Sequence, residues 1–357
     1  MPKKVEVPRE WTPWEKRPER QFLRTLVGAY YDWQRWEISA RLRGVQRLTR
    51  AEREDLERRV ILGEEPDEAP EPRRRAAGKI SPVELTPQQL LKMDGLADRA
   101  DETLKYYLKE IEATLPLFGD HWAWLKAQVG IGPVMGGFVL SQFDPHRART
   151  PSSYWKFAGL HVVPGADGRG HSPHPVKGEK NDYAKGVRVK MVGVLAPNIM
   201  KAGVRAPEDT KGIVRDPAKM VEDGWWLMDT HKGKRWICSP YAQQYFEYRW
   251  RIGTDPTKQW GHEACTKCVS VFRKAGVATE VPTAFRDGKC PTCGSKDPQL
   301  AGGDGNMNQA SFRYLAKMFL VDLWKEQRRI EGLPVVGSYL ERTRGYPHGG
   351  SPQVAAR

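Results

Sequence analysis

The stretch Trp124-Leu125-Lys126-Ala127-Gln128-Val129-Gly130-Ile131-Gly132-Pro133-Val134-Met135-Gly136 carries the clearest fold signal in the chain. It predicts an apolar helix, a Gly-Ile-Gly-Pro turn and a second apolar helix that follows at once, which is the pattern of a helix-hairpin-helix. Glycine lets the hairpin backbone approach a phosphate, and the free N–H groups and dipole of the next helix attract it. Gly130, Ile131 and Gly132 are therefore candidate phosphate contacts. Since Gly-x-Gly alone is a weak signal, an ordinary tight turn between two helices is the alternative.

Two helices with heptad spacing are predicted before this stretch. The first lies in the helical region 1–62, and its apolar seam is Phe22, Leu26, Ala29, Trp33, Trp36 and Ala40. The second spans 86–116, begins with a capping box at Thr86, Pro87 and Gln89, and has the seam Met93, Ala97, Ala100, Leu104, Tyr107 and Ile111. Residues 63–85 between them are rich in Pro, Glu and Arg and are expected to be a linker. The two helices form an antiparallel hairpin, a dimerising coiled coil, or two amphipathic helices on one globular core.

The rest of the chain extends the mainly α prediction. Residues 117–203 hold the helix-hairpin-helix region, and residues 204–260 are a mixed insert, rich in Trp and Lys, without a clear assignment. A strong helix is predicted over 306–333, followed by a tail over 334–357. The apolar stripe of that helix is Phe312, Leu315, Ala316, Phe319, Leu320 and Leu323, with Arg313, Lys317, Lys325, Arg328 and Arg329 elsewhere on it.

Four of the five cysteines stand in two Cys-x-x-Cys pairs within residues 261–299. Cys265 and Cys268 are separated from Cys290 and Cys293 by 21 residues. Two such pairs can place four thiolates tetrahedrally around one zinc ion, and the Cys-Pro-x-Cys-Gly form of the second supplies a tight turn. The sequence predicts an inserted zinc ribbon with one structural zinc per chain. The alternatives are two redox dithiols, or a site in which His262 replaces one cysteine.

A basic segment follows the helix-hairpin-helix region. Between positions 177 and 190 five basic side chains, Lys177, Lys180, Lys185, Arg188 and Lys190, surround Tyr183. Basic residues at a turn that opens a helix are typical of a surface that contacts a nucleic-acid backbone, although a solvated charged face is the plainer reading.

Overall charge agrees with a polyanionic partner. The chain of 357 residues has 58 Lys and Arg against 44 Asp and Glu, a formal net charge of +14. Such a balance favours nucleic acid through neutralisation of phosphates. No stretch reaches the roughly 18 apolar residues of a membrane span, and no signal peptide follows Met1. We therefore expect a cytoplasmic, reducing location and no membrane partner.

The segment around residue 170 contains the side-chain types of a nucleophilic site. Ser172 stands near His161, His171, His174 and Asp167. Because these residue types meet often by chance in loops rich in Gly and Pro, the sequence assigns no catalytic residue.

Residues 120–200 contain three motifs. The first is Gly130-Ile131-Gly132-Pro133, the second is Tyr154-Trp155-Lys156-Phe157-Ala158-Gly159-Leu160, and the third is the basic helix that begins at Lys185. This order resembles the C-terminal domain of the IS-one-ten type insertion-sequence transposases (the IS-one-ten, IS-one-sixteen and IS-nine-oh-two group). The layout with late zinc knuckles is similar to phage and bacterial proteins carried under that transposase label. The resemblance implies a transposase-like domain over 117–203 that contacts DNA, double-stranded or branched, in recombination or in a phage or mobile-element process.

Two features distinguish the chain from the full enzymes of that group. Those enzymes begin with a RuvC-like sheet that bears four acidic residues, whereas residues 1–120 here predict helix and linker. Their catalytic serine follows the Gly-Leu turn, where this chain has His161-Val162-Val163-Pro164-Gly165. A DNA-binding protein without chemistry of its own is the expected function. An active transposase, recombinase or nuclease is one alternative, and a coiled-coil structural or assembly protein that dimerises through its N-terminal helices is another.

Overall fold

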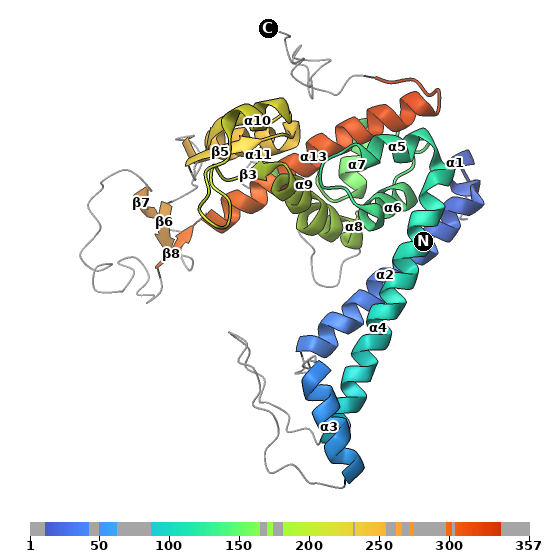
Figure 1. The fold of residues 1–357 in the computed structure, drawn as a ribbon. Coiled ribbons are helices and arrows are strands. Elements are labelled where there is room, and N and C mark those ends of the chain that lie inside the picture. Colours follow the sequence, from blue (N-terminus) through green and yellow to red (C-terminus); the bar gives the residue numbers. More distant parts are fainter. Residues whose placement is uncertain are drawn as a thin grey trace. The chain divides into compact units, whose positions relative to one another are not determined.

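The computed structural model describes residues 11–42, 50–62, 87–164, 170–173, 181–230, 233–254, 262–265, 271–274, 298–301 and 304–336 (Figure 1). These residues are mainly helical, as the sequence predicts. The chain divides into two compact units. Unit 1 comprises Met1–Ala123 and Gly132–Gln142, and unit 2 comprises Trp124–Ile131 and Phe143–Arg357.

Unit 1 is built on two long helices. Its elements are α1 (Pro13–Lys16), α2 (Pro18–Leu42), α3 (Arg50–Leu62), α4 (Pro87–Thr114), η1 (Leu115–Phe118), the start of α5 (Asp120–Lys126), and α6 (Pro133–Gln142). Helix α2 lies along α4, and α3 also packs on α4 (Figure 1). The apolar helix α6 packs on both α2 and α4, so that these three helices share one core.

The predicted seam is correct on α4, but on α2 it holds only in part, since Leu26 is buried and Ala29 half-buried while its three aromatic members are exposed. On α4, Ala97, Ala100 and Ile111 are buried, and Leu104 and Tyr107 are half-buried. On α2, however, the buried face is Leu23, Leu26 and Val27, whereas Phe22, Trp33 and Trp36 are 50%, 38% and 41% exposed. The reason lies in α6, because a Cβ on Gly137 would stand 3.1 Å from Val27 and 3.2 Å from Leu23. The missing side chain lets that face of α2 approach closely. The expected capping residue Thr86 lies outside the described residues.

Unit 2 combines helices with short strands. After the end of α5 come α7 (Pro151–Phe157), the paired strands β1 (Val163–Pro164) and β2 (Gly170–His171), α8 (Lys185–Lys190), the π-helical η2 (Met191–Leu195), α9 (Ala196–Ala202) and β3 (Val204–Arg205). They are followed by α10 (Pro217–Glu222), β4 (Trp226–Thr230), β5 (Gly233–Ile237), α11 (Pro240–Thr254), β6 (His262–Cys265), β7 (Val271–Lys274), β8 (Pro298–Ala301) and α13 (Asp304–Ile330).

Helix α13 forms the centre of unit 2 and packs against α7, α9, η2 and α11 (Figure 1). Every residue of its predicted stripe is buried: Phe312, Leu315, Ala316, Phe319, Leu320 and Leu323. Burial extends beyond that stripe to Met318, Val321 and Trp324, because neighbours cover the helix on several sides. The Trp324 indole N–H donates to the Ala148 carbonyl at 2.7 Å, which joins α13 to the segment before α7.

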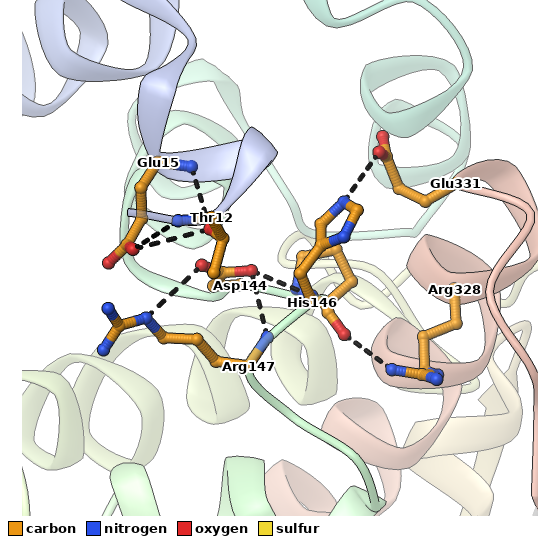
Figure 2. A network of polar contacts seen from close by, with 8 residues as sticks. Thr12, Glu15, Asp144, His146, Arg147, Arg328 and Glu331 are labelled. Carbon is orange, nitrogen blue, oxygen red and sulfur yellow. Dashed lines mark hydrogen bonds and ion pairs between the residues drawn. The ribbon is translucent and has the colours of Figure 1, made fainter. Parts of the chain in front are cut away.

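The segment that enters α7 is fixed by polar contacts with the end of α13 (Figure 2). One Asp144 carboxylate oxygen accepts the backbone N–H groups of His146 and Arg147, at 2.8 and 3.3 Å. His146 Nε2 lies 3.0 Å from a carboxylate oxygen of Glu331. The Arg328 guanidinium donates to the Pro145 carbonyl at 2.7 Å. These contacts fix the start of α7, whose later residues contribute to the surface described below.

The described residues 204–230 and 233–254, which the sequence leaves unassigned, form a three-stranded sheet and the helices α10 and α11. The strands pair antiparallel in the order β3-β5-β4, and α11 follows them with Tyr241, Ala242, Tyr245 and Phe246 buried. Within the predicted ribbon segment, β6 pairs antiparallel with both β7 and β8. Over the part of the chain that the structure describes, no helix is long and apolar enough to cross a membrane.

Candidate nucleic-acid interface

The structure joins the aromatic-Ala-Gly-Leu turn to the start of the basic helix α8. Gly159 ends α7 with a φ of 63°, and a Cβ there would collide with the Tyr183 ring that lies against it. The Ala184 N–H donates to the Phe157 carbonyl at 2.9 Å. Two motifs more than twenty residues apart therefore form one local structure, and only glycine leaves room for the tyrosine at this turn.

Three of the predicted basic residues lie on α8. Lys185 is exposed, while Arg188 and Lys190 are half-buried beside the buried Val187. Arg188 Nη1 donates to the Pro173 carbonyl at 2.5 Å, and its guanidinium carbon lies 5.5 Å from the centre of the Tyr183 ring. Arg188 is therefore held in a fixed position, while Lys185 stays in contact with water. Lys177 and Lys180 lie outside the described residues.

Helix α13 adds two cations that the sequence-based site did not include. Arg313 and Lys317 are both half-buried, and with Arg188 they form what we call the cationic cluster. Burial, and after it the charge of Arg188, lowers the pKa of Arg313. Burial, and after it the charge of Arg313, lowers the pKa of Lys317. Helix α7 links the segments that carry these cations: its Trp155 indole N–H donates to the Lys317 carbonyl of α13 at 3.0 Å, and the Phe157 carbonyl at its end accepts the Ala184 N–H that precedes α8 at 2.9 Å.

Reasoning from sequence missed Arg313 and Lys317 because they occupy polar positions of an amphipathic helix. Such positions normally face water. The sequence does contain one indication: Arg313 and Lys317 are four residues apart, which places both on one face of the helix. That spacing shows a shared face, but only the fold shows that this face meets Arg188.

The predicted helix-hairpin-helix turn is described completely. Gly130 has a φ of 87°, and a Cβ there would lie 2.7 Å from the Asn198 carbonyl oxygen and 2.8 Å from the Ile199 Cα of α9. Ile131 is buried. Gly132 is exposed, and a Cβ on it would meet no atom within 4 Å. Gly130 therefore serves close packing on α9, and the role of all three residues as phosphate contacts stays a prediction.

The zinc prediction concerns residues that are mostly outside the described part. Cys265 is the last residue of β6 and pairs with Pro298 of β8, whereas Cys268, Cys290 and Cys293 are not among the described residues. The zinc ribbon therefore stays a prediction. The fifth cysteine, Cys238, has a raised pKa, chiefly because of burial.

Among the candidate residues around Ser172, the structure describes the side chains of Ser172 and His161, and no hydrogen bond joins these two. His161 Nε2 lies 3.4 Å from a carboxylate oxygen of Asp182, so the histidine faces the start of the basic helix. Its Nδ1 is buried without a hydrogen-bond partner among the described residues. Ser172 is half-buried next to Pro173, whose carbonyl accepts from Arg188. His174 and Asp167 lie outside the described residues.

No protein-family model matches the chain, and comparisons with curated proteins and with solved structures give no significant match. The resemblance to insertion-sequence transposases therefore stays a prediction from the motifs.

Proposed function

We propose that this protein binds the sugar-phosphate backbone of double-stranded or branched DNA, in recombination or another process of a mobile element or phage. Its DNA contacts would be the turn at Gly130, Ile131 and Gly132 and the basic residues from Lys177 to Lys190. One structural zinc on Cys265, Cys268, Cys290 and Cys293 would hold an accessory ribbon. Backbone contacts of this kind give affinity without reading bases.

The main support for this proposal is that basic residues gather on α8 and that packing contacts hold this helix in place. Lys185, Arg188 and Lys190 lie within one short helix that is anchored by Val187 and by the Tyr183–Gly159 contact. A solvated charged face needs no such support, because mobile lysines and arginines suffice for solubility. An arginine held beside an aromatic ring, with an exposed lysine on the same short helix in a chain of net charge +14, fits a polyanion instead.

The salt dependence of DNA binding tests this function. Fluorescence anisotropy with labelled duplex and four-way-junction DNA should show log K falling steeply with log salt, by about 0.9 per phosphate neutralised on a duplex. The double variant Lys185→Ala/Lys190→Ala should lower that slope by up to about 1.8, from the same relation for two contacts. The effect should be the same for unrelated sequences.

A matched control removes two exposed lysines of unit 2 that lie outside α8. Lys211→Ala/Lys219→Ala loses the same charge, and both side chains are exposed. If both double variants lost the same amount of DNA affinity and salt slope, net charge alone would explain the binding. Binding that is independent of salt would refute backbone contact.

A second candidate function is self-association through the N-terminal helices. The observation that favours it is the aromatic face of α2, where Phe22, Trp33 and Trp36 are exposed at seam positions, and the two tryptophan rings lie 5.9 Å apart. Large exposed aromatics at heptad spacing are typical of a helix that packs on another helix. If a homodimer forms this way, Trp33→Glu/Trp36→Glu should give a monomer in analytical ultracentrifugation. A wild-type protein that is monomeric at high concentration would exclude it.

A further inference from the structure

The cationic cluster is placed by neutral groups. Lys317 Nζ lies 5.6 Å from the centre of the Trp155 ring, and the Trp155 indole N–H donates to the Lys317 carbonyl at 3.0 Å. Arg188 donates to a backbone carbonyl and lies near the Tyr183 hydroxyl, 3.4 Å from Nη1. Aromatic faces and carbonyls orient a cation but leave its charge in place. Lys317 and Arg188 are therefore held in place by neutral groups and keep their positive charge.

Carboxylates do not neutralise this charge in the part of the chain that the structure describes. There, neither Arg313 nor Lys317 forms an ion pair, and the neighbouring Asp182 faces His161 at 3.4 Å. Elsewhere the described arginines are commonly paired, as Arg53 is with Asp94 and Asp98 at 2.5 and 2.6 Å. Like charges that are half-buried together destabilise a fold. An apolar side chain at position 317 would avoid that repulsion.

We propose that Arg188, Arg313 and Lys317 form a binding site for one phosphate group of the DNA backbone. The inference rests on the proposed function and adds α13 to its surface. A phosphate between three cations relieves their mutual repulsion, and a guanidinium can donate two hydrogen bonds to its oxygens. Trp155 and Tyr183 hold two of these cations in position, Lys317 and Arg188, before any phosphate binds. Since no carboxylate pairs with Arg313 or Lys317 among the described residues, the proposed phosphate would supply the opposite charge.

The first test is thermal unfolding of the full chain in sodium phosphate and in sodium chloride at equal ionic strength. Wild-type protein should melt higher in phosphate, by roughly 2–4 °C at saturation. Lys317→Met keeps an unbranched apolar stem along Trp155 but removes the charge. It should melt above wild type in chloride, because repulsion is relieved, and it should lose the phosphate-dependent rise. The control Lys219→Met, an exposed lysine on α10, should respond to phosphate like wild type.

The outcomes separate this site from the proposed function. A phosphate response in Lys317→Met equal to that of wild type, or a lower melting temperature of this variant in chloride, overturns the site. If Lys317→Met folds poorly, Arg313→Gln tests the same site, and it too should lose the phosphate-dependent rise in melting temperature. Where wild-type protein shows the phosphate rise but binds no DNA, a site for a phosphate anion stands, while its assignment to the DNA backbone and the DNA-binding function both fail. Where DNA binds and Lys317→Met leaves its salt slope unchanged, the function stands and this site fails; we expect that slope to fall by about 0.9.

Discussion

Gly130 and Gly132 are two residues apart in the same turn, yet the structure gives them different roles. A Cβ at Gly130 would lie within 2.9 Å of three backbone atoms of α9, and its φ of 87° disfavours any other residue. We expect Gly130→Ala to lower the free energy of unfolding by about 1–3 kcal/mol, through overpacking and backbone strain. Urea unfolding followed by circular dichroism measures this loss.

Gly132→Ala is the natural control for that change, because a Cβ there meets open space. Its stability should stay within about 0.5 kcal/mol of wild type. If the turn contacts phosphate, the same variant should weaken DNA binding without loss of stability. Equal destabilisation by the two substitutions would contradict the packing of Gly130 on α9.

Tyr31 gives unit 1 a measurable dependence on alkaline pH. Burial, and after it the charge of Tyr30, raises the pKa of Tyr31 to about 12 from its ordinary 10.0. Between these values the unfolded chain loses the phenol proton while the folded chain keeps it, so stability is lost as pH rises from 10 towards 12. Tyr31→Phe removes the titrating group but keeps the ring, which lies 6.1 Å from the Phe138 ring in an edge-on arrangement.

Below pH 10 the free energies of unfolding of Tyr31→Phe and wild type should therefore differ by a constant amount. From pH 10 to pH 12 the variant should become progressively more stable relative to wild type. Denaturant titrations at several pH values follow it. Two curves that stay parallel over this range would show that Tyr31 ionises equally well in the folded and unfolded chains.

At the level of elements, the strands β6, β7 and β8 leave little apolar area for a core of their own, since each has four residues. In such a module the free energy of metal binding is largely folding free energy. We predict one zinc per chain, and Cys290→Ser should abolish it and loosen the strands, as measured by metal analysis and hydrogen exchange. Cys238→Ser should still bind one zinc ion per chain. Zinc retained in a variant without both Cys-x-x-Cys pairs would rule the site out.

Helices were predicted best where apolar residues recur with one helical period, because that period alone determines which face is buried. The α13 stripe from Phe312 to Leu323 and the α4 seam from Ala97 to Ile111 were predicted correctly, because a 3.6-residue period marks one face. On α2, tryptophan and phenylalanine outweighed Leu23 and Val27 in the pattern, but the glycine surface of α6 selected the smaller side chains. Helix α11 was missed because Arg249 lies on its buried face and Trp250 on its exposed face, which hides the helical period of the buried Tyr241, Tyr245 and Ile252.

The candidate site was predicted only where it is local in sequence. The basic segment around Tyr183 includes Arg188, which the structure places in the cationic cluster. Arg313 and Lys317 come from a helix more than a hundred residues later, and their proximity to Arg188 depends on how α13 packs against η2. No pattern within either segment carries that information.

For the molecule as a whole, we predict that the isolated chain cuts no DNA. Phosphodiester cleavage needs carboxylates that converge on a metal ion, or a nucleophile with groups that stabilise the charged transition state. In unit 1, Asp94 is buried and both it and Asp98 are engaged with Arg53. In unit 2, His161 faces Asp182. Supercoiled and branched DNA incubated with the protein and Mg²⁺ or Mn²⁺ should stay intact.

Nicking in that assay would show the prediction to be wrong, and two variants would identify the chemistry. Loss of nicking in Ser172→Ala would make that serine the nucleophile. Loss only on removal of an acidic residue would reveal a metal site instead.

The central place of α13 also has a consequence for how the protein is made. The bond from Trp324 to Ala148 joins residues that are 176 positions apart. At a synthesis rate of 5–20 residues per second, roughly 10–35 s pass between the emergence of α7 and that of its partner helix. During that interval the apolar face of α7, and those of α9 and α11 once they are made, lack the helix that covers them. Unit 2 is therefore completed only after α13 leaves the ribosome, and the nascent chain is a natural client for chaperones.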